Sequence, residues 1–278
     1  MKQLLLSLAL VAGFSAFAQT TISNKEEVSG TWKKSKSPYI IEGEAIIPEG
    51  KTLTIKAGVV VKFKTGEGRD YDMDDFNLGF LRVNGKIIAK GKPSKRILFT
   101  GNGSGFWGNI YVNSPDQNHV FENCVVEKAY YIRKVIPTDN GTGAITFNKS
   151  TGIVKNCILA NNGWTGLNCK NGASPTISNC VIYNNEYGLE SNTRSTPTIE
   201  NTIIWNNGTT FYINGSSAPK IGYCFIGEDK LPEGITDQGG NILGKNPQFE
   251  DAMIGNFKLK QESPCRKVGK GGKNIGLE

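Results

Sequence analysis

Residues 154–159 read Val-Lys-Asn-Cys-Ile-Leu, and closely similar segments return every 22 or 23 residues in the second half of the chain. The later copies begin at Ile177, Ile199 and Ile221, and an earlier copy begins at Phe121, 33 residues before Val154. A repeat of this length cannot bury a core alone, whereas stacked copies can. The copies are rich in β-branched residues, and no segment has sustained helical periodicity. The pattern therefore predicts an all-β solenoid of short strands.

Asparagine recurs at two places in the repeat. Asn tolerates left-handed backbone at bends and can hydrogen-bond to the same residue in the next coil. Both columns therefore predict structural corners. The first column is Asn123, Asn156, Asn179 and Asn201, and the second is Asn162, Asn185 and Asn207.

Four of the six cysteines also share one place in the repeat, which Thr202 occupies in one coil. Six cysteines in an exported protein would ordinarily indicate disulfides. Because strands in adjacent coils lie about 4.8 Å apart, a single column favours a ladder of buried, reduced thiols instead. The ladder is Cys124, Cys157, Cys180 and Cys224; Cys169 and Cys265 have no evident partner.

Three apolar columns adjoin in the repeat, although successive side chains of a strand alternate between faces. The middle column is named the apolar stripe and comprises Val125, Ile158, Val181, Ile203 and Phe225. We favour a bend of the chain that turns all three columns inward. The alternative is an outward stripe, which would need a loop, a ligand or a second molecule to cover it.

The chain resembles secreted right-handed parallel β-helix proteins of the pectin-lyase-like superfold. The resemblance implies a single right-handed parallel β-helix of roughly ten turns with irregular N- and C-terminal caps. It is specific for architecture and does not assign an activity. It is carried at the N-terminal end by Ile46, Pro48-Glu49-Gly50, Leu53-Thr54-Ile55, Gly58-Val59, Val61-Lys62-Phe63, Val83, Gly85, Ile88-Ala89, Gly91, Ile97, Phe99-Thr100, Trp107-Gly108 and Ile110, and at the C-terminal end by Asn246-Pro247, Phe249, Ser263-Pro264-Cys265 and Ile275-Gly276.

The N-terminus has the pattern of a secretory signal peptide: Lys2, an apolar run and Ala16-Phe17-Ala18. We expect residues 1–18 to be the signal peptide, residues 19–38 an N-terminal lead or cap, and residues 39–278 the β-helix domain with its closing turns. The run is short for a membrane span of about 20 residues. The expected location is therefore secreted, periplasmic or at the cell surface, with no transmembrane segment.

Charge and residue counts exclude several classes of function. The formal net charge is +7, and the basic residues are dispersed, so nucleic-acid binding is not expected. His119 is the only histidine, which excludes catalytic triads and zinc sites that need two. No phosphate-binding loop or nucleophile elbow is present.

An acidic insertion near residue 70 is a candidate metal site. Aspartates at every second position resemble the opening of a calcium loop, but the glycine and the bidentate glutamate that such a loop requires are missing. We favour a solvated acidic loop, with calcium as the only cofactor considered. The candidate ligands are Asp70, Asp72, Asp74 and Asp75.

The 33-residue coil carries an extra loop from Tyr130 to Asn140, and inserted loops on rigid scaffolds often carry sites. Aromatic residues recur on the regular coils nearby and would form a flat strip for sugar rings, although ordinary edge packing explains them equally well. The candidate carbohydrate-binding residues are Tyr130, Tyr131, Arg133, Lys134, Trp164, Tyr183, Tyr187 and Trp205.

Three functions remain open, and polysaccharide binding outside the cell is the first. The second is a calcium-dependent lyase of uronic-acid polymers, because the resemblance implies a Lys or Arg base beside a calcium-neutralised carboxylate. Its candidate bases are Arg133, Lys134 and Arg194. The third is a non-enzymatic structural or adhesive module that docks through the apolar stripe. The oligomeric state is left open.

Overall fold

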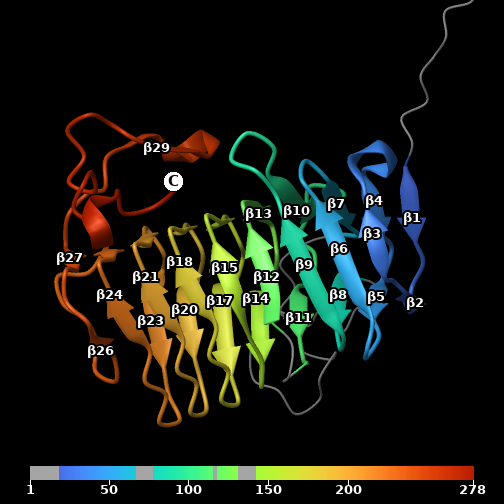
Figure 1. The fold of residues 1–278 in the computed structure, drawn as a ribbon, viewed down its shortest axis with the longest axis horizontal. Coiled ribbons are helices and arrows are strands. Elements are labelled where there is room, and N and C mark those ends of the chain that lie inside the picture. The colour runs from blue at the N-terminus through green and yellow to red at the C-terminus, as the bar shows by residue number, and fades with distance from the viewer. Residues whose placement is uncertain (1–18, 67–77, 115–117, 131–141) are drawn as a thin grey trace, which may run out of the picture.

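A computed structural model describes residues 19–66, 78–114, 118–130 and 142–278. The described chain winds through three parallel sheets, and each of the first eight coils contributes one strand to each sheet. Figure 1 shows the coils following one another along the long axis, from β1 in blue to β26 in orange. The prediction of an all-β parallel solenoid is confirmed.

The strands of the three sheets are short and run parallel to their neighbours. The ten-stranded sheet contains β1 (Thr20–Ile22), β4 (Tyr39–Ile41), β7 (Val60–Phe63), β10 (Ile97–Gly101), β13 (Cys124–Val126), β16 (Ile158–Ala160), β19 (Val181–Tyr183), β22 (Ile203–Trp205), β25 (Phe225–Ile226) and β27 (Ile242–Leu243). The eight-stranded sheet contains β2 (Glu26–Glu27), β5 (Glu44–Ile47), β8 (Phe80–Val83), β11 (Ile110–Val112), β14 (Gly143–Asn148), β17 (Thr165–Lys170), β20 (Tyr187–Ser191) and β23 (Thr209–Ile213). The nine-stranded sheet contains β3 (Gly30–Trp32), β6 (Thr52–Lys56), β9 (Lys86–Lys90), β12 (Asn118–Glu122), β15 (Thr151–Lys155), β18 (Thr176–Ser178), β21 (Thr198–Glu200), β24 (Lys220–Gly222) and β26 (Thr236–Asp237).

The remaining elements lie at the two ends of the described chain. Strands β28 (Phe249–Asp251) and β29 (Asn256–Leu259) form an antiparallel pair, and short 3₁₀ helices are η1 (Lys34–Lys36), η2 (Ala252–Ile254) and η3 (Lys270–Gly272). Residues 19–38, expected as a lead, already supply β1, β2 and β3, which pair with strands of the next coil. The solenoid therefore begins within that segment.

The core is one continuous column of buried side chains from Ile22 to Ile226. All six cysteines are buried and free, as the ladder prediction requires. Burial raises the pKa of the Cys224 thiol to about 12, and it raises the pKa of Cys169 as well. Such thiols are protonated at neutral pH and serve as packing groups.

The first asparagine column supplies the left-handed residue at four successive corners before the ten-stranded sheet. The φ angles of Asn123, Asn156, Asn179 and Asn201 lie between 47° and 53°. The left-handed residue bends the chain from one sheet to the next, and Asn adopts this backbone region with little strain. The prediction that Asn provides the corner conformation is confirmed.

The interpretation of the apolar stripe as a bend is wrong. Its members pair in register across the ten-stranded sheet, and alternation directs them away from the core. They form a second buried cluster with side chains of residues 245–278, here called the C-terminal segment, among them Phe249, Phe257, Cys265 and Ile275. The C-terminal segment covers the stripe because burial of this apolar surface stabilises both partners.

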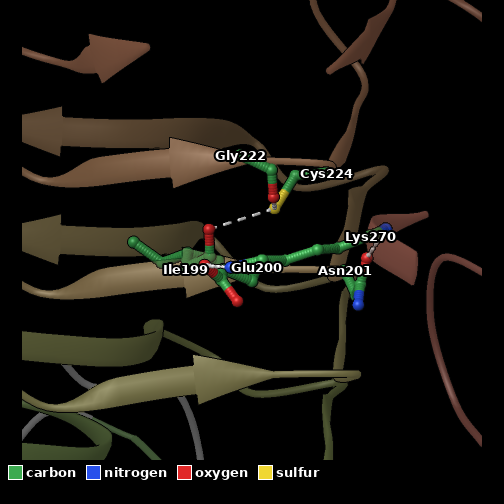
Figure 2. A network of polar contacts seen from close by, with 6 residues as sticks. All are labelled: Ile199, Glu200, Asn201, Gly222, Cys224 and Lys270. Atoms are coloured by element: carbon green, nitrogen blue, oxygen red, sulfur yellow. Dashed lines mark hydrogen bonds and ion pairs between the residues drawn. The ribbon is translucent and has the colours of Figure 1, made fainter. Parts of the chain in front are cut away.

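Polar contacts hold the C-terminal segment along the stripe. The backbone N–H groups of Lys270 and Gly276 donate to Asn201 at 2.8 and 2.7 Å, and that of Glu278 donates to Asn156 at 3.4 Å. Figure 2 shows Lys270 over the corner of Glu200 and Asn201, with the Cys224 thiol directed to the Ile199 carbonyl. The segment thus returns across several coils, which Figure 1 shows as the red chain above the strands.

Candidate functional site

The corner between the ten-stranded and eight-stranded sheets is built on paired asparagines. The first of each pair, Asn161, Asn184 and Asn206, has φ between 52° and 58°. The second of each pair forms a ladder: Asn162 Nδ2 donates to Asn185 Oδ1 at 2.8 Å, and Asn185 Nδ2 donates to Asn207 Oδ1 at 2.9 Å. This ladder confirms the predicted amide stacking and makes the corner rigid.

Five aromatic side chains, here called the ring row, follow this corner from coil to coil. Consecutive ring centroids are 5.2–6.4 Å apart, and neighbouring ring planes are inclined by 35–69°. The row is therefore stepped, with edge-to-face contacts, rather than flat as predicted. Its members in chain order are Phe106, Tyr130, Trp164, Tyr187 and Tyr212.

Gly163 has no side chain, and the rings of Phe106 and Tyr130 occupy the space that a side chain would fill. A Cβ atom at this position would lie 2.6 Å from Tyr130 Cδ2 and 2.9 Å from Phe106 Cε1. Both separations are shorter than real Cβ contacts, so any side chain here would displace the rings. The glycine is thus required by ring packing and by no unusual backbone angle.

A groove of about 420 Å³ runs along the corner beside the ring row. Exposed amides border it, and Asn184 Nδ2 donates to Asn161 Oδ1 at 2.8 Å. Amides offer both donors and acceptors, which suits hydroxyl groups. The volume and the mixture of rings with a few polar groups are typical of a ligand site. The groove is lined by Phe106, Tyr130, Asn161, Asn162, Gly163, Trp164, Asn184, Asn185, Glu186 and Gly208.

A buried polar cluster lies on the outer face of the eight-stranded sheet. Glu190 is one residue of β20, in register with Asn168 of β17. Its Oε2 atom accepts hydrogen bonds from Thr165 Oγ1 at 2.6 Å and from Asn168 Nδ2 at 2.7 Å. Burial raises the pKa of the Glu190 carboxyl, and Lys170 opposes that effect. Tyr187 begins the same strand, so cluster and ring row share β20.

The structure brings together three of the predicted carbohydrate-binding residues and separates two others. Tyr130, Trp164 and Tyr187 belong to the ring row. Tyr183 instead contacts Phe249 and Phe257 of the C-terminal segment, and Trp205 packs against Phe225 of the apolar stripe. The predicted aromatic residues therefore divide between two faces.

Of the remaining candidates, only Arg194 lies within the described residues, and it does not line the groove. Arg194 is an exposed residue in the loop after β20, with φ of 61°. Among the described residues, no group of three or more His, Cys, Asp or Glu side chains could hold a metal ion. Tyr131, Arg133, Lys134, Asp70, Asp72, Asp74 and Asp75 lie outside the described residues.

Sequence reasoning did not identify Phe106, Tyr212 or the exposed amides as parts of this site. Phe106 precedes the first regular copy of the repeat, and Tyr212 lies five residues after its corner asparagine, whereas Tyr187 lies two after. Asn161 and Asn184 were visible as the first members of the asparagine pairs. Their repetition beside recurring aromatic residues was the available signal.

The sequence model of the family described as the right handed beta helix region matches residues 98–247, which is 150 of 278 residues. The chain therefore belongs to this right-handed β-helix family. No curated protein matches the chain. Within the described part, no helix has the length and apolar character needed to cross a membrane.

Proposed function

We propose that this protein binds a polysaccharide in the groove beside the ring row. The observation that carries the proposal is that a ring follows an asparagine pair on two successive coils beside the groove, Trp164 after Asn161-Asn162 and Tyr187 after Asn184-Asn185. Coils are about 4.8 Å apart, so a chain of similar units lying along the axis meets similar partners repeatedly. A polymer of sugar rings has that regularity.

The chemistry of the groove supports a sugar ligand. Trp164 lines the groove and is half-buried, so its ring is accessible to the apolar face of a sugar. Tyr187, half-buried, and Tyr212, 45% exposed, continue the ring row next to the groove lining. The amides of Asn161 and Asn184 are exposed beside them and can exchange hydrogen bonds with hydroxyl groups. Tyr130 is 8% exposed, and its ring packs between those of Phe106 and Trp164 in the ring row.

The proposed site of action is outside the cytoplasm. The signal-peptide pattern of residues 1–18 supports export, and extracellular or periplasmic glycans are the polysaccharides that an exported protein meets. Expression with residues 1–18 intact, followed by fractionation and N-terminal sequencing, tests export. Recovery of the uncleaved chain in the cytoplasm would contradict it.

The binding proposal is tested with two tryptophan variants. Trp164→Ala removes a ring from the groove, and we expect the affinity for the best-binding glycan to fall about tenfold. Trp205→Ala removes a ring from the covered face and should change the affinity less than about twofold. A glycan screen identifies the ligand, titration calorimetry measures affinity, and circular dichroism verifies folding. Equal losses in both variants, or no glycan bound by the wild type, would overturn the proposal.

A further inference from the structure

The charge of the groove differs from the charge of the chain. The whole chain carries a formal net charge of +7. Among the described residues that line the groove, however, Glu186 is the only acidic or basic residue, and it is exposed. Lys128, which occupies the corner site one coil before Asn161, is not part of the described lining. The described lining of the groove is therefore neutral to acidic, whereas the chain as a whole is basic.

From this contrast we infer that the groove selects neutral, hydroxyl-rich polysaccharides over polymers that carry carboxylate or sulfate groups. The inference rests on the proposed function and specifies its ligand class. A neutral sugar ring meets the aromatic faces and the amides without an electrostatic cost. An anionic sugar beside Glu186 would place like charges close together, which costs about 1 kcal/mol at 4 Å in water.

The exposed amides point to the same class. Asn161 and Asn184 already share one hydrogen bond at 2.8 Å, which leaves an amide N–H pair and a carbonyl oxygen for a ligand. Hydroxyl groups can satisfy both donor and acceptor, whereas carboxylates only accept. Neither amide supplies the positive charge that recognition of acidic polymers ordinarily uses.

The test compares neutral xylan and β-glucan with polygalacturonate at low salt, using the full chain. We expect at least one neutral polymer to bind about tenfold more tightly than polygalacturonate. Glu186→Gln should raise the ratio of polygalacturonate affinity to neutral-polymer affinity about fivefold at low salt, and the rise should vanish near 1 M salt. The matched control is Glu122→Gln, which removes a carboxylate from β12 in the nine-stranded sheet and should leave the ratio unchanged.

The possible outcomes separate the ligand class from the binding proposal. Polygalacturonate binding that depends on Trp164 and equals or exceeds neutral binding would overturn the inference while supporting the proposed function. An unchanged ratio in Glu186→Gln would also overturn the inference. Failure of every polymer to bind would overturn both.

Discussion

The outer surface of this solenoid carries two series of large apolar side chains, and they differ in what contacts them. The apolar stripe on the ten-stranded sheet is buried beneath the C-terminal segment, with Ile203 and Phe225 at 0% exposure. The ring row on the adjacent corner borders an open groove. Both include residues that the 22- or 23-residue repeat supplies, such as Ile203 in the stripe and Tyr187 in the ring row. An outward apolar column is thus compatible with either an internal cover or a ligand site, and the rest of the chain decides between them.

The largest expected effect comes from weakening the cover. Phe257 is 5% exposed, and its ring centroid lies 5.3 Å from that of Tyr183 and 5.2 Å from that of Phe249. Phe257→Ala should lower the free energy of unfolding by about 3–5 kcal/mol, because it removes a buried ring and leaves a cavity. Denaturant unfolding measures the change.

The control for this comparison is Tyr212→Ala in the ring row. Tyr212 is 45% exposed, so its removal should change the free energy of unfolding by less than about 1 kcal/mol. Similar losses in both variants would mean that the two surfaces do not differ in their contribution to stability.

The repeat made the coils predictable but not the cover. Columns of Asn and Cys could be assigned because each position recurs, and the register of the strands follows from that recurrence. The C-terminal segment has no copy of the repeat, and its contacts join residues as far apart as Glu278 and Asn156. Phe249 and Phe257 therefore gave no local signal of their partners. The sequence alone therefore could not show what covers the stripe.

The candidate site was predictable in the same partial way. Trp164 and Tyr187 follow the asparagine pairs at fixed distances, so repetition placed them on one corner. Tyr183 and Trp205 also recur, and alternation along the strand directs them outward, but only the fold of the C-terminal segment determines that this face is covered. Periodicity determines the face of a side chain, while its exposure depends on long-range packing.

Acid should destabilise the interior of the solenoid, where His119 is buried. His119 is buried, its Nδ1 accepts from the Ile87 N–H at 3.4 Å and its Nε2 faces the Ser114 carbonyl at 3.3 Å. Burial lowers the pKa of His119 from 6.5 to about 4. The unfolded chain takes up the proton first as the pH falls, so this stability is present above pH 6.5 and is lost toward pH 4. The loss should total about 3 kcal/mol.

Denaturant unfolding at several values between pH 7 and pH 4 measures this loss. His119→Gln should have a smaller slope of stability against pH than the wild type, because it lacks the titrating group. The destabilisation caused by Phe257→Ala should be the same at pH 7 and pH 5, since the Phe257 side chain has no titratable group. A variant slope equal to that of the wild type would show that His119 does not dominate the acid response.

The smallest expected effect concerns the asparagine pair that supports the groove. Asn185 is 4% exposed; its side chain donates to Asn207 and to the Leu159 carbonyl at 3.0 Å, and it accepts from Asn162. Asn185→Ala leaves several buried groups without partners and should lower the free energy of unfolding by about 2 kcal/mol.

Asn184→Gly is the matched control. Asn184 is exposed with φ of 52°, which glycine adopts without strain, so we expect the free energy of unfolding to change by less than about 0.5 kcal/mol. If Asn184→Gly nevertheless weakens glycan binding while Asn185→Ala acts mainly on stability, the outer amide contacts the ligand and the inner amide holds the corner; the reverse pattern would contradict this division.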